Sequence, residues 1–130
     1  MTDAESLAME PLIWFPHDAD AAADPKSRRV MRRFGAAGYG RWWLLCEALA
    51  SEPGHALPIA TDNDRENLAV TLDMDGAEDV TGFLAFLADV GLVSSDGEKV
   101  WSERMNKNAL RSGASRAQRV RAVNRRWGKE

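Results

Sequence analysis

The sequence predicts a mostly α fold with a small β-hairpin, followed by a basic C-terminal tail that is helical or disordered. Apolar residues recur at helical spacing in four segments between residues 25 and 90. Asp96-Gly97, a strong hairpin signal, lies between two short apolar pairs. Nine of the 17 Lys and Arg residues fall in the last 27 positions, which hold a single carboxylate. At 130 residues and 45% hydrophobic, the chain is long enough to bury one ordinary core.

The first two helices are predicted on either side of Gly35. Asp24 is a typical N-cap residue and Pro25 suits the first helical position, so a helix from about Pro25 to Phe34 is expected. Gly35 ends this helix. The segment from Ala36 to Ser51 has helical spacing and is far more apolar, which predicts the central buried helix of the fold.

A short strand and two further helices come next. Residues 56–59 predict a strand, and Pro58 favours an edge position because proline lacks the N–H that a ladder needs. Helical spacing then predicts helices from about 63 to 72 and from about 76 to 90, separated only by residues 73–75. Two helices joined by so short a turn are typical of a helix-turn-helix.

A two-stranded ribbon completes the predicted domain. Leu92-Val93 and Val100-Trp101 flank the Asp96-Gly97 turn, which predicts a hairpin directly after the fourth helix. Helix, strand, helix, tight turn, helix and hairpin in this order form a winged helix-turn-helix, in which the hairpin is the wing. Helix-turn-helix modules bind DNA more often than they do anything else.

Charge divides the chain into unequal parts. We expect a flexible N-terminus (residues 1–12), a winged-helix domain (residues 13–103) and a basic tail (residues 104–130). Residues 1–103 carry eight Lys or Arg against nineteen Asp or Glu, a net charge of −11, whereas the tail has a net charge of +8. This asymmetry predicts an anionic partner for the tail, and nucleic acid is the leading candidate.

The tail supplies most of the candidate contacts with nucleic acid. Its cations are Arg104, Lys107, Arg111, Arg116, Arg119, Arg121, Arg125, Arg126 and Lys129. A narrow apolar stripe at helical spacing runs among them, formed by Leu110, Ala114, Ala117, Val120, Val123 and Trp127. A helix this basic is marginal alone in water, so we expect it to become ordered on binding. Two partners stay open: nucleic acid, which meets the arginines, or the acidic part of another copy, which meets the arginines and Trp127.

Five further cations lie on the first predicted helix. They are Lys26, Arg28, Arg29, Arg32 and Arg33, which are candidate phosphate contacts if one face of the helix is free. The alternative is a solvated surface helix whose cations pair with nearby carboxylates. In the wing, Lys99 is the only cation and is included among the candidates, although Asp96 and Glu98 flank it.

The helix from residue 76 to residue 90 occupies the place of a DNA-reading helix, but its expected outer face is acidic. At 100° per residue, Glu78 and Asp89 lie opposite the apolar stripe, and the helix contains no Lys or Arg. Because the duplex repels carboxylates, we do not expect this helix to read bases. Phe86, at the margin of the stripe, is either a core residue or a contact with another protein chain.

Enzymatic, metal and membrane functions are not expected. His17 and His55 are the only histidines, and the sequence has no zinc-site or metalloprotease spacing. The carboxylates that follow His17 are interpreted as a turn held by Asp side chains. Cys46 is single, which excludes an internal disulfide and agrees with a cytoplasmic location. No apolar run approaches the roughly 20 residues of a spanning helix, and no cofactor or secretory signal is predicted.

Several short motifs together resemble a known family. They are WFPHD (residues 14–18), Asp24-Pro25-Lys26, FGAAGYG (residues 34–40), the Trp-rich helix and the hairpin that begins at Gly91-Leu92-Val93. This combination resembles the amino-terminal domain of phage and prophage replisome-organiser proteins, which are DnaD-like replication initiation factors. The resemblance covers roughly residues 13–128, and RAVNRRWGK (residues 121–129) is similar to the basic stretch that often follows this domain. In larger relatives the domain is joined to a partner-binding or helicase-loading part.

Two classes of function follow from the sequence. The first is a nucleic-acid-binding winged-helix module of phage or prophage DNA replication initiation, which contacts phosphates mainly through the basic tail. The second is a winged-helix module for protein–protein interaction or self-assembly, with no direct DNA reading. A steep fall of DNA affinity with salt favours the first, and salt-insensitive self-association without DNA binding favours the second.

Overall fold

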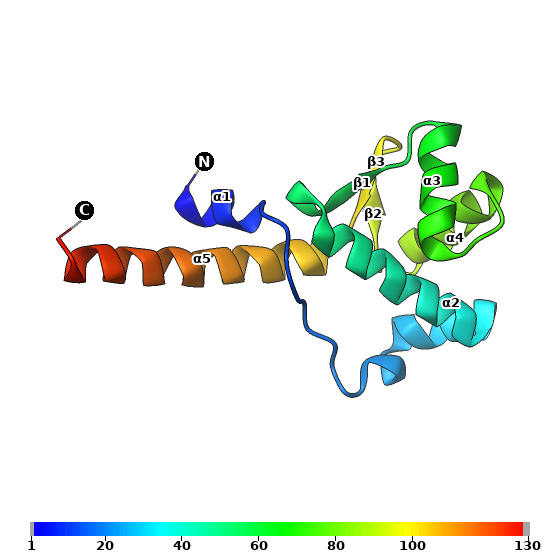
Figure 1. The fold of residues 1–130 in the computed structure, drawn as a ribbon. Coiled ribbons are helices and arrows are strands. Elements are labelled where there is room, and N and C mark those ends of the chain that lie inside the picture. The colour runs from blue at the N-terminus through cyan, green and yellow to red at the C-terminus, as the bar shows by residue number, and fades with distance from the viewer. Residues whose placement is uncertain (1, 129–130) are drawn as a thin grey trace.

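Five α-helices and three short strands make up the fold in the computed structural model, which describes residues 2–128 (Figure 1). The helices are α1 (Asp3–Ala8), α2 (Pro25–Ser51), α3 (Asp62–Leu72), α4 (Ala77–Asp89) and α5 (Glu103–Arg126). The strands are β1 (Ala56–Pro58), β2 (Ser94–Ser95) and β3 (Lys99–Trp101). Short 3₁₀ helices at Ala21–Ala23 and Pro53–His55 precede α2 and β1. The predicted class, mostly α with a small hairpin, is confirmed; Lys129 of the predicted tail lies outside the described residues.

Helix α2 joins the two helices predicted around Gly35 into one bent element. The side chain of Asp24 accepts a hydrogen bond from the Lys26 amide at 2.8 Å, as expected of an N-cap residue. Gly35 has φ 76° and ψ −171°, which is not helical, so the break falls at the predicted position. Glycine suits this position because it adopts positive φ without a steric penalty.

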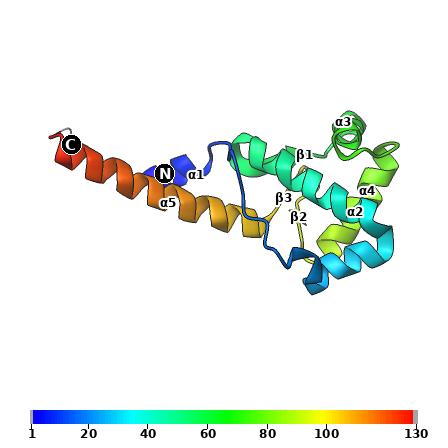
Figure 2. The same ribbon diagram turned by 60° about the horizontal axis from the view of Figure 1, so that its bottom comes forward.

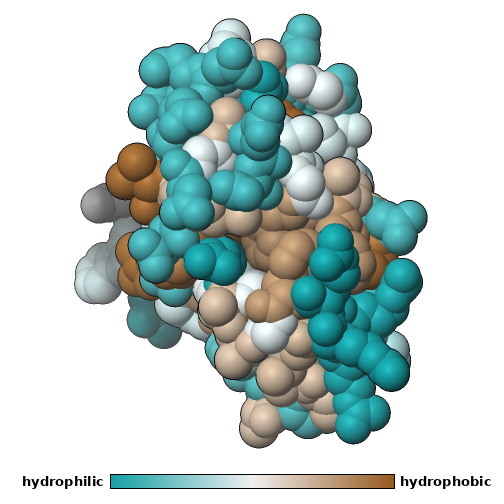
Figure 3. Space-filling view, turned by 90° about the vertical axis from the view of Figure 1, so that its right-hand side faces the viewer, coloured by the Kyte–Doolittle hydropathy of each residue, from teal (hydrophilic) through white to brown (hydrophobic). Residues whose placement is uncertain are grey.

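The hydrophobic core lies between α2, α3, α4 and the sheet. Its largest fully buried side chains include Leu45, Leu49, Leu72, Phe83, Leu87, Val30, Val80 and Val100. The apolar stripe predicted for the fourth helix is confirmed, because Val80, Phe83, Leu84, Leu87 and Val90 are all buried. Seen from the side opposite to α5, apolar residues gather at the middle of the surface and hydrophilic residues surround them (Figure 3).

The turn between α3 and α4 is tied to the central helix. Asp73 adopts the left-handed conformation, with φ 56° and ψ 50°. The Arg41 guanidinium on α2 donates hydrogen bonds to the carbonyl oxygens of Leu72 (3.2 Å) and Asp73 (3.2 and 2.9 Å). These carbonyls end α3, so Arg41 satisfies acceptors that the helix itself leaves unpaired. The helix-turn-helix is therefore present where the sequence predicts it.

A three-stranded antiparallel sheet replaces the predicted two-stranded ribbon. Strand β3 is central, and both Leu57 of β1 and Ser95 of β2 lie opposite its residue Val100. The edge position expected from Pro58 is confirmed, because β1 is an outer strand.

The first strand of the hairpin was predicted two residues too early. Leu92 and Val93 are not in the ladder, which begins at Ser94. Gly91 has φ 85°, and the Leu92 amide donates to the Leu87 carbonyl at 2.9 Å, so these residues close the end of α4. Leu92 and Val93 are apolar because they pack on the core, not because they pair with β3.

Helix α5 extends away from the rest of the fold, and α1 lies along it (Figures 1 and 2). We call α1 and α5 the arm, residues 25–102 the body, and residues 9–24, which connect α1 to α2, the strap. Residues 1–12 were predicted to be a flexible N-terminus, and the part of this segment that the structure describes contains the short helix α1. Thr2 and Glu5 form a reciprocal capping box at its start.

Small residues on α5 allow α1 to approach closely. Ala109, Gly113 and Ala117, at intervals of four, are buried on one face of α5. A Cβ at Gly113 would lie 2.4 Å from the Ala4 carbonyl oxygen and 2.9 Å from the Ala8 nitrogen. Only glycine therefore fits between the two helix backbones.

No helix within residues 2–128 is long and apolar enough to cross a membrane.

Candidate nucleic-acid interface

The cations of α5 lie mainly on the side away from α1. Eight of them are within the described residues: Arg104, Lys107, Arg111, Arg116, Arg119, Arg121, Arg125 and Arg126. At 100° per residue, all but Arg116 and Arg121 fall within an arc of about 120°, opposite the face that α1 covers. No segment of this chain was predicted to pack on the tail, so the division of α5 into a covered face and a cationic face was not predicted.

Two of these cations pair with acidic residues of the strap. Arg104 is 3.1 Å from the Asp18 carboxylate, and Arg116 is 2.9 Å from the Glu10 carboxylate. The other six are exposed and make no ion pair within residues 2–128: Lys107, Arg111, Arg119, Arg121, Arg125 and Arg126. Exposed arginines in a row along a helix are suited to phosphate contacts.

Apolar side chains occupy the distal end of the same helix. Val120, Val123 and Trp127 are 54%, 51% and 68% exposed. At 100° per residue, they continue the face that α1 covers nearer to the body. This part of the predicted apolar stripe therefore has no partner within residues 2–128. Trp127 stays a candidate protein contact.

The basic cluster of α2 is partly used within the body. Lys26 donates to the Gly91 carbonyl at 3.3 Å, and Arg29 lies 3.8 Å from Asp89. Arg33 lies over the Phe34 ring, with its guanidinium carbon 5.3 Å from the ring centre. The remaining two, Arg28 and Arg32, are exposed. For Arg29, the alternative of pairing with a nearby carboxylate is confirmed.

Helix α4 presents carboxylates to solvent, as predicted. Glu78, Asp79 and Asp89 are exposed, and the helix contains no cation. Phe86 is half-buried, 5.1 Å edge to face from Phe34, with Arg29 6.0 Å from its ring centre. It therefore packs within this chain, and its role as a contact with another chain stays a prediction.

The wing has little positive charge. Lys99 is exposed beside Glu98, and the Asp96 carboxylate accepts hydrogen bonds from the amides of Glu98 (2.9 Å) and Lys99 (2.8 Å). The bond from the Lys99 amide, followed by that from Glu98, lowers the pKa of Asp96 from its ordinary value of 3.8. The wing tip thus keeps a negative charge.

A large cleft separates the strap from the body and α5. Its volume is about 1610 Å³. Cations of α5 (Arg104, Lys107, Arg111, Arg116 and Arg119) line it together with Lys26, and the strap contributes Glu10, Asp18, Asp20 and Asp24. Trp42, Trp43 and Cys46 of α2 also line it. The cleft brings Lys26 to the tail cations, whereas Arg28 and Arg32 do not reach it.

Aromatic rings of the strap stack on Trp43. The His17 ring lies 3.7 Å from the Trp43 ring, centre to centre, at an interplanar angle of 10°. Phe15 is stacked at 5.9 Å with the same angle, and Tyr39 meets Trp43 edge to face at 6.2 Å. The buried indole Nε1 of Trp43 has no hydrogen-bond partner. Unpaired buried donors are uncommon and costly.

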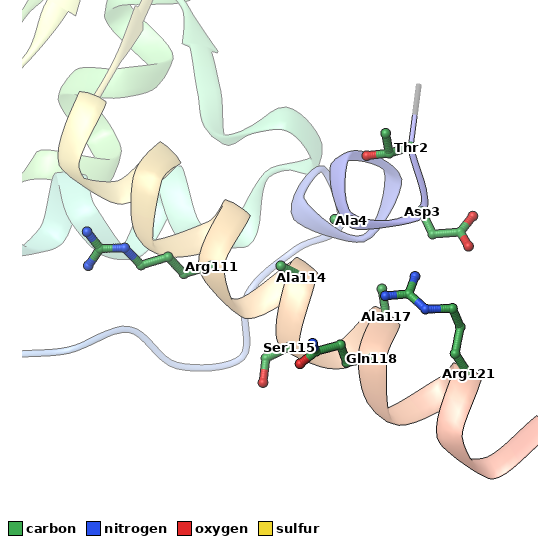
Figure 4. A pocket seen from close by; sticks show the side chains of 9 residues that line it. All are labelled: Thr2, Asp3, Ala4, Arg111, Ala114, Ser115, Ala117, Gln118 and Arg121. Carbon is green, nitrogen blue, oxygen red and sulfur yellow. The ribbon is translucent and has the colours of Figure 1, made fainter.

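A second, smaller hollow of about 700 Å³ lies between the start of α1 and α5 (Figure 4). Arg121 extends from α5 toward Asp3, whereas Arg111 points away from α1 on the other side. The hollow is lined by Thr2, Asp3, Ala4, Ala114, Ser115, Ala117 and Gln118 as well as these two arginines. It holds no cluster of catalytic groups.

Metal and thiol chemistry find no support in residues 2–128. No group of three or more His, Cys, Asp or Glu side chains is placed to hold a metal ion. The turn after His17 is held by backbone hydrogen bonds from Ala21 to Asp18 and from Ala23 to Asp20, not by Asp side chains as predicted. Burial, followed by the charge of Glu47, raises the pKa of the Cys46 thiol to about 12.

Sequence reasoning missed the strap as part of the candidate site. The motif WFPHD was identified, but its His17 and Asp18 were assigned to a local turn. Their contacts with Trp43 and Arg104 join residues 26 and 86 positions apart. The sequence did contain one sign of these contacts, because the strap is acidic whereas the tail is basic.

The comparisons with known proteins concern the strap and the body. A family described as Lin1244/Lin1753-like, N-terminal, matches residues 14–105. No curated protein and no solved structure matches the chain. The resemblance to replisome organisers stays a prediction. Because the match spans most of the chain, this protein belongs to the Lin1244/Lin1753-like N-terminal family.

Proposed function

We propose that the chain is a nucleic-acid-binding winged-helix module that contacts phosphates mainly through α5. The observation that carries this proposal is the set of six exposed cations on α5 that make no ion pair within residues 2–128, five of which lie on the face away from α1. Each phosphate contact releases counterions, so such a row binds any sequence of a polyanion. The acidic outer face of α4 supports a module with little base reading.

The biological setting that we propose comes from the resemblance. A winged-helix domain with these motifs fits phage or prophage DNA replication initiation in the cytoplasm, with nucleic acid and replication proteins as partners. We assign no reaction and no cofactor to the chain. Arg28 and Arg32 are secondary phosphate contacts because they are exposed but lie apart from the cleft.

Paired substitutions in the full chain test the proposal. Arg125→Ser with Arg126→Ser should weaken binding to all duplex sequences about equally, because phosphate contacts carry no base information. Loss of two contacts should also make the slope of log affinity against log salt shallower by about 2. Arg28→Ser with Arg32→Ser removes the same charge from α2 and should have a smaller effect. Unchanged affinity of the α5 variant would contradict the proposal.

The exposed apolar end of α5 favours a second function, self-association or docking on another protein. Val120, Val123 and Trp127 form a hydrophobic face bordered by arginines. Trp127→Ala should abolish self-association measured by analytical ultracentrifugation, while Val70→Ala, at an 83% exposed site on α3, serves as the control. If Trp127→Ala leaves a monomeric protein unchanged but weakens DNA binding, the face belongs to the nucleic-acid site.

A further inference from the structure

We propose that the strap occupies a seat for single-stranded nucleic acid, and that a single strand displaces it to reach Trp43 and the first half of α5. This inference rests on the proposed function and names the form of nucleic acid and its place.

The middle of the strap is held by side chains alone. Its first end is fixed by main-chain groups: the Leu12 amide donates to Ala50 at 2.7 Å, and the Glu10 carbonyl lies 2.9 Å from His55 Nε2. Within the described residues, no backbone hydrogen bond joins residues 13–17 to the rest of the chain. This stretch crosses the cleft of about 1610 Å³, and Ile13 and Trp14 are 98% and 73% exposed. It can therefore leave without breaking any secondary structure.

The contacts of the strap have the chemistry of a nucleotide strand. Its carboxylates at Glu10 and Asp18 sit on Arg116 and Arg104, where phosphates would sit. The exposed His17 ring lies flat on Trp43 at 3.7 Å, where a base would stack. A row of anions with flat rings between them is the recognition pattern of single-stranded nucleic acid.

The cleft contains cations and a hydrogen-bond donor that the strap leaves unpaired and that a single strand can contact. Lys107, Arg111 and Arg119 line it and have no ion pair within residues 2–128. The Trp43 Nε1 donor has no partner either. A strand therefore gains contacts that the strap does not make. A duplex gains fewer, because its bases are already stacked and paired and cannot cover Trp43.

Fluorescence anisotropy with the full chain tests the competition. The strap variant is Glu10→Gln with Asp18→Asn, and the control is Glu98→Gln with Asp75→Asn, which removes the same charge from exposed sites with no hydrogen bond to their side chains. On labelled dT20, the strap variant should bind about fivefold more tightly than the control, because it lacks two competing ion pairs. On a 20-base-pair duplex the two should bind alike. Equal affinities for dT20 would overturn the proposal.

Proton NMR of the histidine rings tests the displacement directly. Stacking on Trp43 shifts the signals of the His17 ring protons upfield. The other histidine is His55, and a His17→Gln variant shows which signals belong to which ring. Saturating dT20 should return the His17 signals to their unstacked positions and leave those of the buried His55 in place. Binding of dT20 with the His17 signals unmoved would overturn this inference but leave the proposed function standing.

Two further outcomes separate the proposals. If neither dT20 nor duplex binds at low salt, the proposed function fails together with this inference. If a polyglutamate peptide displaces His17 as well as dT20 does, the cleft accepts any polyanion, and its assignment to single-stranded nucleic acid is wrong.

Discussion

At the scale of single residues, burial separates the two adjacent tryptophans of α2. Trp42 is 7% exposed and belongs to the core, whereas Trp43 is half-buried at the edge, between the core and the strap. Neighbouring positions on a helix point about 100° apart, so only one of such a pair can face the centre. Helical geometry alone requires this inequality, but it does not say which tryptophan is the inner one, because that depends on contacts with the strap, which lies outside α2.

We expect the two tryptophans to differ in stability measurements. Trp42→Ala should lower the free energy of unfolding by about 3–5 kcal/mol, the usual cost of removing a buried aromatic side chain. Trp43→Ala should cost less, because Trp43 is only half-buried and stacks on the exposed His17. Denaturant melts of both variants provide the measurement. Equal and small losses would show that α2 is not the central helix.

At the scale of elements, the bounds predicted from the sequence were accurate where residues close together in the chain determine the structure. Helices α3 and α4 were placed to within one residue, because spacing and turn residues act locally. The predicted position of strand β2 was wrong because Leu92 and Val93 are apolar in order to pack on the core, not to form the strand. Helix α1 was missed because it packs on α5, which lies about 100 residues later in the chain. Gly113 is a poor helix former by its intrinsic propensity, yet it is the residue that lets α1 pack closely on α5.

Gly113→Ala should detach α1 from α5. The added Cβ would meet backbone atoms of α1 at 2.4 and 2.9 Å, and backbone cannot move aside as a flexible side chain can. Faster proteolysis within residues 2–12 is the expected result. Gly82→Ala on α4 is the control, because a Cβ there has nothing within 4 Å and should stabilise the helix by about 1 kcal/mol. Equal protease resistance of the Gly113 variant and the native chain would contradict the α1–α5 packing.

The hairpin turn should lose stability in acid because of Asp96. Its pKa is lower in the folded chain than the ordinary 3.8, so its contribution is complete above about pH 4 and disappears as the pH falls through the folded-state pKa. Asp96→Ala should therefore lower the melting temperature at pH 6, and the difference from the native chain should shrink toward pH 2. A difference in melting temperature that stays constant between pH 6 and pH 2 would show that the ionised Asp96 carboxylate does not stabilise the turn.

At the scale of the whole molecule, the separation of charge along the chain was predicted, and its arrangement in space was not. Counting residues was enough to find the basic tail. The covered face of α5 and the acidic strap depend on contacts across the fold, which composition does not contain. The candidate site is therefore larger than the tail, because it includes Trp43 and the two carboxylates that pair with Arg104 and Arg116.

The salt dependence of DNA binding should report the number of cations engaged. If the six unpaired cations of α5 each neutralise one phosphate, log affinity should fall with log salt at a slope of about −5 on duplex DNA. Serine at Arg119, Arg121, Arg125 and Arg126 should reduce the slope to about −2, because two of the six cations remain. Titrations between 50 and 200 mM salt measure both. An unchanged slope would show that these four arginines make no phosphate contacts.

The length of α5 keeps the opposite charges of the molecule from cancelling one another. Arg119 lies 16 positions beyond Glu103, which is about 24 Å along a helix that rises 1.5 Å per residue. Charges in physiological salt are screened over about 8 Å, so the distal arginines do not sense most of the carboxylates of the body. At about 10 mM salt the screening distance grows to about 30 Å, and the repulsion between the acidic body and a bound polyanion reaches the end of the helix. At physiological salt, the length of α5 therefore shields the distal arginines from the negative charge of the body, and at low salt it does not. The increase in DNA affinity should accordingly level off as the salt concentration is lowered.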